Sequence, residues 1–472
     1  MATTAIAALS QLIHEELSLS KKDLEPGVDG IFEKMYTSSA GVERDVGRTW
    51  QKILTFVTGL AGSFKNVDIV GHGADARATG QVHNWDASPR VYPGLTNQPF
   101  SGSVQKKITL VEGMGTMHIP IHHLQVDRLD AAMGQTLSRL IRGTAKRVAM
   151  DDARCYYTND ATVKPIWKGS TTIADSVPTN TNTTTVHSFG GDAVGRIGRL
   201  APGDQVDARD VSDANDDVLT NGSGGIVTKV DYIGKTFSVI WSGTVTFDDL
   251  DYITQHGSLE TDVASTFGPS GAETWLVNSG TVFNLSLTTH PQFKSLIVAA
   301  GGAVMEENFL NKYCGGFYDA YGGMYDLDSI ITTTGVATAW LDSLDGLGRF
   351  ARNGKALTVK GGWMSMGYVY NGKEFEMLIS RFQAGGQAYI CKMGENNLRR
   401  CVPPPMSGTG GMNDFAGEIQ FVAPLMGSAT NFLPHYDSGL TQFIHAPFSC
   451  FREWYPEQIP GIKVTGLAEI NP

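Results

Sequence analysis

The sequence is poor in cysteine and has no long apolar run. Its five cysteines are scattered without Cys-x-x-Cys spacing, which argues against a disulfide framework and favours synthesis in a reducing cytoplasm. No stretch approaches the roughly 18 consecutive apolar residues of a membrane-spanning helix. Residues Met1–Ser10 lack the basic start of a secretory signal. We therefore expect neither a membrane-spanning helix nor a secretion signal.

Basic residues are outnumbered, with 37 Lys and Arg against 48 Asp and Glu and a net charge of −11. A dedicated DNA-binding protein needs a basic surface to neutralise phosphates, so this class is disfavoured. The net charge does not exclude a protein that encloses DNA without binding it tightly. The chain of 472 residues is 41% hydrophobic and 18% charged, an ordinary globular composition, and is long enough for two or more subdomains.

Signatures of catalysis are missing as well. The sequence contains no Gly-x-Ser-x-Gly elbow and no His-Glu-x-x-His motif. His118, His122 and His123 suggest a metal site, but on a strand His118 and His122 would lie about 13 Å apart. One zinc ion could not join them without other ligands, so we interpret them as polar positions on an edge strand. We expect no enzyme activity, no metal and no cofactor.

The first 66 residues predict an arm of linked helices. Apolar residues recur at helical spacing over about Thr4–Lys22, and Pro26, Gly27 and Gly30 are expected to end this helix. A second helical pattern runs roughly over Arg44–Leu60. The arm is therefore expected to be mainly helical rather than a compact domain.

Beyond the arm, the chain is expected to be extended as far as about His123. A polar, irregular part of this stretch carries Trp85, Tyr92 and Phe100, which have little local core to join. Aromatic residues are typical anchors of interfaces, so we hypothesise that these three pack on an adjacent subunit.

A β-hairpin is predicted at the end of this stretch. Residues Lys107–Leu110 and Met117–Ile121 alternate in polarity, and a turn is expected between them at 112–115. Pro120 cannot donate to a ladder, so its strand is expected at a sheet edge. A two-stranded hairpin with few core residues is marginally stable alone and usually packs on a partner surface. This is the first sign of a protein that assembles with others.

The clearest helix is predicted over about Val126–Tyr157, where apolar residues recur at steps of three and four. Opposite this apolar stripe, a narrow wedge of the helix is basic and consists of Arg128, Arg139, Arg142 and Lys146. One interpretation of the wedge is a solvated helix face. The other is that it pairs with carboxylates of a neighbouring subunit, a role that suits the planar fork of arginine.

After a Ser- and Thr-rich linker, closely spaced strands with glycine turns predict a small inserted β-barrel at 186–258. We expect its strands near 203–206, 225–230, 236–241 and 243–247. The remainder mixes helices near 304–321 and 336–352 with strands near 356–362, 375–381 and 388–393, which is an α+β pattern.

This order of parts resembles the Hong Kong 97-like fold of the major capsid proteins of tailed bacteriophages. Three sets of residues carry the resemblance. The first runs from Ile108-Thr109-Leu110 through Ile119-Pro120-Ile121 to Val126-Asp127-Arg128-Leu129, and is similar to the return of that family's extended loop into its spine helix. The second is Asp328-Ser329-Ile330-Ile331 with Gly361-Gly362-Trp363, and the third holds Tyr370-Asn371-Gly372-Lys373, the stretch at 382–390 and Leu398-Arg399-Arg400.

The resemblance implies an α+β fold with seven segments. They are an N-terminal arm at 1–66, an extended loop at 67–124, a peripheral domain with the spine helix at 125–185, the inserted β-barrel at 186–258, a return of the peripheral domain at 259–300, an axial domain at 301–411 and a final peripheral part at 412–472. The loop would also hold Lys106 and Lys107, in the place where some relatives form crosslinks between subunits. No partner for such a crosslink can be assigned here, so we expect none.

The implied function is assembly of an icosahedral head shell that encloses the phage genome. The expected partners are the chain itself in hexamers and pentamers, with portal, scaffold and decoration proteins. Double-stranded DNA would be enclosed without sequence-specific binding, and no membrane would be involved. The expected location is the virion, after assembly in the bacterial cytoplasm. The alternatives are another phage structural protein, such as a tail-tube or decoration subunit, and a hydrolase with a β-barrel accessory domain.

Overall fold

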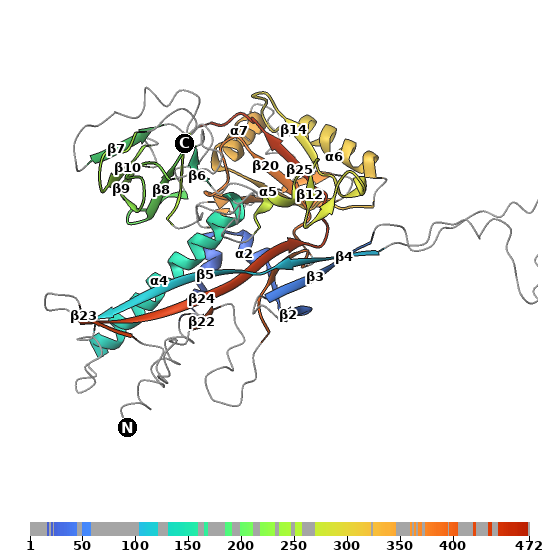
Figure 1. The fold of residues 1–472 in the computed structure, drawn as a ribbon. Coiled ribbons are helices and arrows are strands. Elements are labelled where there is room, and N and C mark those ends of the chain that lie inside the picture. The colour runs from blue at the N-terminus through green and yellow to red at the C-terminus, as the bar shows by residue number, and fades with distance from the viewer. Residues whose placement is uncertain are drawn as a thin grey trace, which may run out of the picture. The chain divides into compact units, whose positions relative to one another are not determined.

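The structure is a computed structural model, and it describes about three-fifths of the chain. The described residues are 17, 20–21, 23–44, 50–57, 103–120, 131–158, 165–168, 185–190, 199–210, 218–231, 236–246, 251–256, 270–321, 324–345, 359–360, 363–364, 367–370, 373–394, 396–404, 419–421, 433–436 and 442–470. The chain divides into two units (Figure 1). One unit is Met1–Lys52 with Thr109–Pro472, and the other is Ile53–Ile108.

The N-terminal part differs from the prediction where its first helix was expected to end. A helical turn continues through Pro26 and Gly27 to residue 28, and most of the helix expected over Thr4–Lys22 lies outside the described residues. Helix α2 (Ile31–Lys34) and the strands β1 (Tyr36–Ser38) and β2 (Val42–Arg44) follow.

The helix expected over Arg44–Leu60 is wrong, because β3 (Trp50–Val57) is a strand that pairs with β2. Trp50, Leu54 and Phe56 are buried, whereas Thr55 and Val57 are exposed. Short apolar runs fit both a helical and an alternating pattern. Here the pairing with β2 decides for the strand.

The second unit holds the larger part of β3 and nearly all of β4 (Ser103–Thr109), which are neighbours in a sheet ordered β2-β3-β4. The hairpin predicted within 107–121 is wrong, because its expected turn at 112–115 lies inside the continuous strand β5 (Val111–Pro120).

Strand β5 pairs antiparallel with β24 (Gln442–Pro456) over its whole length, from Val111 opposite Arg452 to Pro120 opposite Phe443 (Figure 1). This partner lies more than 300 residues away in the sequence, so local patterning could not reveal it. Within the described strands β24 is the one neighbour of β5, which agrees with the edge position inferred from Pro120.

The sheet that contains β5 and β24 has six strands. Its main path is β1-β21-β24-β22, and β23 also pairs with β24. The strands not yet introduced are β21 (Leu398–Cys401), β22 (Ile419–Phe421) and β23 (Leu433–Tyr436).

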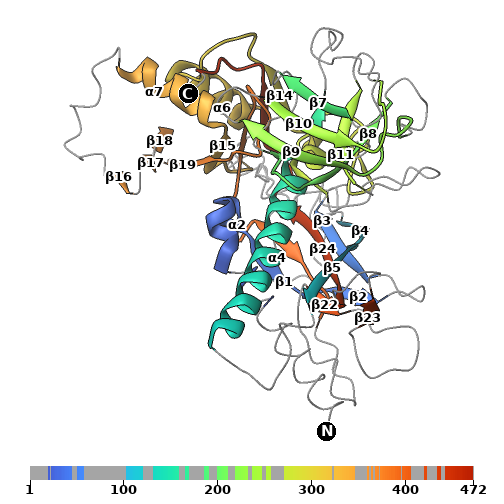
Figure 2. The ribbon, with the colours of Figure 1, turned by 90° about the vertical axis from the view of Figure 1, so that its left-hand side faces the viewer.

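Helix α4 (Ala131–Thr158) confirms the long predicted helix over its described part, since residues 126–130 lie outside it (Figure 2). The helix contacts β5, β6 and the short helix α5 (Ala272–Trp275). Its buried face recurs at steps of four and three, at Ile141, Ala145, Ala149, Ala153 and Tyr156.

A second six-stranded sheet replaces the predicted inserted barrel. Its order is β6 (Pro165–Lys168), β11 (Tyr252–Gln255), β8 (Gln205–Arg209), β9 (Gly225–Asp231), β10 (Thr236–Trp241) and β7 (Thr185–Gly190). Among the described residues no pairing joins the two end strands, β6 and β7, so the sheet is not closed there. The prediction of a barrel is wrong for this part of the chain. Short strands with regular spacing do not fix closure, which depends on tilt and stagger.

Three of the four strands predicted for this region are present as β8, β9 and β10. The fourth strand, predicted near 243–247, is wrong, because the described residues 243–246 form no strand. The sheet contains β11 instead. One face of the sheet buries a compact core that includes Val206, Val227, Phe237, Val239 and Trp241.

The third six-stranded sheet lies in the predicted α+β region. Its order is β14 (Leu296–Ala299), β25 (Ile462–Thr465), β20 (Ala388–Cys391), β15 (Ser329–Thr332), β19 (Lys373–Ile379) and β18 (Gly367–Tyr370). Helices α6 (Glu307–Tyr321) and α7 (Thr334–Asp345) confirm the two helices predicted there over their described parts. The short pairs β12–β13 (Thr281–Val282, Leu285–Ser286) and β16–β17 (Val359–Lys360, Trp363–Met364) and the 3₁₀ turn η5 (Pro291–Phe293) complete the elements.

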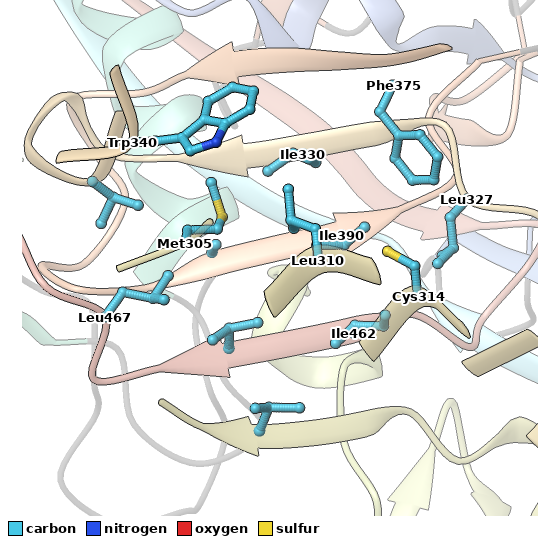
Figure 3. Packing of buried hydrophobic residues seen from close by; sticks show 14 of the residues in the cluster. Met305, Leu310, Cys314, Leu327, Ile330, Trp340, Phe375, Ile390, Ile462 and Leu467 are labelled. Carbon is cyan, nitrogen blue, oxygen red and sulfur yellow. The ribbon is translucent and has the colours of Figure 1, made fainter. Parts of the chain in front are cut away.

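A hydrophobic core lies between this sheet and its helices (Figure 3). Leu310, Cys314 and Phe317 from α6 meet Ile330 of β15 and Ile390 of β20, all of them fully buried. Their steps of four and three along α6 are the amphipathic pattern that the sequence displays. The α+β class of the chain is therefore confirmed.

Candidate assembly surface on helix α4

One exposed side of α4, next to its buried stripe, is basic. Arg139, Arg142 and Lys146 have exposed side chains, whereas Arg128 lies outside the described residues. From residue 139 to residue 150 the helix carries no acidic side chain. Steps of three and four residues bring the three cations onto one face. The chain thus presents a row of positive charge on a rigid element.

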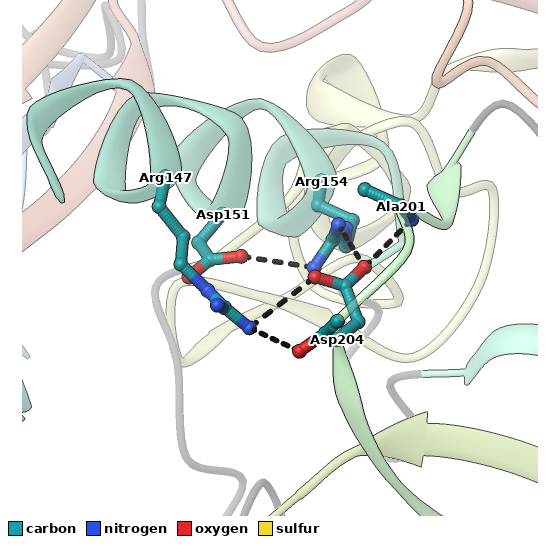
Figure 4. Close-up of polar contacts among 6 residues, drawn as sticks. Arg147, Asp151, Arg154, Ala201 and Asp204 are labelled. Atoms are coloured by element: carbon teal, nitrogen blue, oxygen red, sulfur yellow. Dashed lines mark hydrogen bonds and ion pairs between the residues drawn. The ribbon is translucent and has the colours of Figure 1, made fainter. Parts of the chain in front are cut away.

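The next turns of α4 carry ion pairs that the sequence analysis missed (Figure 4). Arg154 donates through Nη2 to Asp204 Oδ2 at 2.7 Å and through Nη1 to Asp151 Oδ1 at 2.9 Å. Arg147 lies 3.4 Å from Asp204 Oδ1 and donates to the carbonyl of Gly203 at 3.1 Å. These contacts fasten the helix to the loop that enters β8.

Asp204 is placed by its own loop. Its Oδ2 also accepts the backbone N–H of Ala201 at 2.8 Å, and its carbonyl accepts the N–H of Val227 at 2.9 Å. Burial raises the pKa of the neighbouring Asp151 carboxyl, while the Arg154 guanidinium opposes this shift. A clue in the sequence was the pair Gly203-Asp204 just before a strand, although nothing there identifies arginines 50 residues away as its partners.

A second polar group ties the N-terminal segment, residues 20–38, to α4 and to β21. Lys21 lies 2.6 Å from Asp152 Oδ2 and 3.3 Å from Glu25 Oε1. The same Glu25 oxygen accepts from Arg400 at 2.8 Å. Strand β1 of the segment also adds to β21 in parallel. Ion pairs and strand pairing thus hold residues of this segment against α4 and β21.

The other predicted site residues are placed only in part. Lys106 is half-buried and Lys107 is exposed, both on β4. Trp85, Tyr92 and Phe100 lie outside the described residues, as do His122 and His123. The described residues hold no group of three or more His, Cys, Asp or Glu side chains that could bind a metal ion. In the same part of the chain no helix is both long and apolar enough to span a membrane.

Comparison with known proteins gives no match to a family model and none to a curated protein by sequence. Among solved structures, the chain is similar to the capsid of cyanophage A-1(L), with 8% identity, 92% of this chain and 90% of that chain covered, and a TM-score of 0.42.

Two further similar structures are capsids. The capsid of an empty GTA particle has 9% identity, with 94% of this chain and 90% of that one covered and a TM-score of 0.35. The capsid of Myoviridae phage XM1 has 9% identity, with 92% and 90% covered and a TM-score of 0.33.

Proposed function

We propose that the chain is the major capsid protein of a tailed bacteriophage and assembles into the icosahedral shell that encloses the genome. The observation that carries the proposal is the unit of residues 53–108. Its described part consists of most of β3 and of β4, which with β2 form a sheet of three short strands. An extended excursion with so few strands usually needs a partner surface. A second copy of the chain would provide that surface in a closed shell, where one face of each subunit meets a different face of the next.

The finer parts of the proposal follow the resemblance. Residues 1–66 act as the arm and 67–124 as the extended loop. Helix α4 acts as the spine of a peripheral domain formed by 125–185, 259–300 and 412–472. Residues 186–258 form an inserted domain, and 301–411 form the axial domain. The chain acts as a structural protein, needs no cofactor and encloses double-stranded DNA in the virion, after assembly in the host cytoplasm.

The basic face of α4 is proposed as a contact between subunits. Arg139, Arg142 and Lys146 are exposed within one chain, and the chain carries a net charge of −11. Acidic surface is therefore plentiful on a second copy, and arginine pairs with carboxylates in a bidentate manner. Trp85, Tyr92 and Phe100, with Lys106 and Lys107, are proposed to contact a neighbour from the loop. Hexamers and pentamers are the proposed capsomers, and portal, scaffold and decoration proteins are the further partners.

Electron microscopy with sedimentation of the full chain, alone and with a candidate scaffold, tests the proposal. Closed shells or free hexamers and pentamers are expected. Tubes of uniform narrow bore would instead indicate a tail protein. A monomer that persists under every condition would contradict the proposal and favour an enzyme.

Charge reversal on α4 tests the contact itself. We expect Arg139→Glu and Arg142→Glu to lower particle yield while the free energy of unfolding of the subunit stays within about 0.5 kcal/mol, as is usual for exposed sites. Lys229→Glu on β9 is the matched control, because its exposed charge lies on another element. Particle yield equal to the wild type in both α4 variants would exclude the contact.

A further inference from the structure

The buried face of α4 contains a carboxyl group that meets an amine from the N-terminal segment, residues 20–38. Asp152 is fully buried, as are Ala149 and Tyr156, which lie about one turn before and after it. Nζ of Lys21 lies 2.6 Å from Oδ2 of Asp152, and the Lys21 side chain is only 2% exposed. An amine and a carboxyl group therefore lie in direct contact inside the protein.

A second carboxylate lies beside the same amine. Glu25 follows Lys21 by four residues, and its Oε1 lies 3.3 Å from Lys21 Nζ. Arg400 donates through Nη1 to the same Oε1 at 2.8 Å and so fixes the position of this carboxylate. Arg400 and Leu17, which precedes Lys21 by four residues, are buried as well. Water therefore has little access to this group of side chains.

The surroundings of Lys21 differ from those of two other paired lysines. Among the ion pairs described here, Lys34 and Lys463 each meet a single carboxylate, whereas Lys21 meets two. The side chain of Lys34 is also 29% exposed, so water solvates its charge. Buried charges lose their hydration, and a neutral product avoids that penalty. With two carboxylates beside one amine, one of them can react while the other moves a proton.

We propose that Lys21 and Asp152 become joined by an amide bond between Nζ of the lysine and Cγ of the aspartate, and that Glu25 is the proton carrier of this reaction. Cγ is bonded to the Oδ2 that Nζ contacts, so the two reacting atoms are already held together. An amine and a carboxyl group fixed in this way react as if each were present at very high concentration.

The reaction needs no further reactant. Lys21 passes one proton to Oδ2 of Asp152, which leaves a neutral amine and a neutral acid, and the lone pair of Nζ then attacks Cγ. Glu25 accepts a second proton from the nitrogen and returns it to the departing oxygen. The C–O bond breaks, one water molecule leaves and Glu25 regains its starting charge. An ammonium and a carboxylate are thus converted into one amide and one water molecule.

The bond ties the N-terminal segment to α4 covalently. An ion pair opens whenever the segment moves away from the helix, whereas an amide bond stays intact, because a site with little water protects it from hydrolysis. Both residues belong to one chain, so the proposal does not depend on the proposed capsid function.

The intact mass of the purified full-length chain, measured after denaturation, tests the proposal. We expect this mass to be lower than that of the unmodified sequence by the mass of one water molecule. A chain at the full mass would show that Lys21 and Asp152 form an ion pair only, and it would overturn the proposal.

Digestion with trypsin locates the bond. The amide blocks cleavage after Lys21, so the peptide that ends at Lys22 should be found joined to the peptide 148–154, which contains Asp152. Cyclisation of an aspartate to a succinimide removes the same mass but joins no peptides. A mass loss without the joined peptides would therefore contradict the bond.

Three variants make the test specific. Lys21→Arg keeps the positive charge but provides no reactive amine, and Glu25→Gln removes the proton carrier, so both should keep the full mass. Lys34→Arg is the matched control, because it changes another lysine of the same segment and should lose one water molecule as the wild type does. If a variant fails to fold, the wild-type mass and the joined peptides still decide. Loss of water in Lys21→Arg, or in Glu25→Gln to the same extent as in the wild type, would contradict the mechanism.

Discussion

Arg154 of α4 and Asp204 of the loop before β8 form a buried ion pair, with 2.7 Å between Nη2 and Oδ2. The two side chains are only 3% and 8% exposed. The pair joins the long helix to the six-stranded sheet that follows it in the sequence. Its geometry is supported by Asp151 on one side and by the N–H of Ala201 on the other.

Removal of Arg154 should be costly, because Asp204 would stay buried and keep only its longer ion pair with the exposed Arg147 among the pairs described here. We expect Arg154→Met to lower the free energy of unfolding by about 3–5 kcal/mol in denaturant titrations. Arg147→Met is the matched control, because Arg147 is 56% exposed and its pair with the same aspartate should be worth no more than about 1 kcal/mol. The double variant Arg154→Met/Asp204→Asn should recover part of the loss. A loss in Arg154→Met no larger than in Arg147→Met would refute this account.

Gly225 of β9 lies against the indole of Trp241 on β10. A Cβ atom at residue 225 would come within 2.3 Å of the ring, and Trp241 is fully buried in the core of the sheet. We expect Gly225→Ala to destabilise the protein by about 1–3 kcal/mol through overpacking.

Gly143 of α4 provides the opposite case. A methyl group there would meet no atom within 4 Å, so Gly143→Ala should stabilise the helix by about 0.5–1 kcal/mol through its higher helix propensity. Thermal unfolding of the two variants side by side checks both signs. Equal effects of the two substitutions would show that space at Gly225 is not the cause.

The thiols of Cys314, Cys391 and Cys401 should be inert in the native protein. Burial raises the pKa of Cys314 and of Cys401 to about 12 and that of Cys391 further still. The thiolate is the reactive form, so it is scarce up to at least pH 9. We expect a chromogenic thiol reagent at pH 8 to react with these three only after denaturation. The half-exposed Cys155 provides the contrast. Rapid labelling of any of the three in the native state would contradict their burial.

Regular local patterns made part of the fold predictable. The steps of three and four along α4 and α6 and the glycine-bounded strands β8, β9 and β10 identify these elements from the sequence alone. The basic residues of α4 were likewise assigned to one face, because helix geometry fixes which side chains share a side.

Other predictions failed where pairing with another strand decides between two structures that the local sequence allows. The residues of β3 fit a helix as well as a strand, and pairing with β2 settles the choice. The residues of 112–115 suit a turn, yet ten residue pairs with β24 keep β5 continuous. Closure of the sheet that contains β8, β9 and β10 depends on how its end strands β6 and β7 approach each other, which strand spacing does not encode.

The sequence by itself determined the α+β class, the long helix with its basic face, and the absence of recognisable catalytic motifs, because these follow from composition and local periodicity. Only the tertiary structure decided that Arg154 meets Asp204, that β5 joins β24, and that Lys21 meets Asp152. Each of these contacts joins residues that lie 50 or more positions apart. Burial and ionisation depend on what surrounds a group in space, and a position along the chain does not record this.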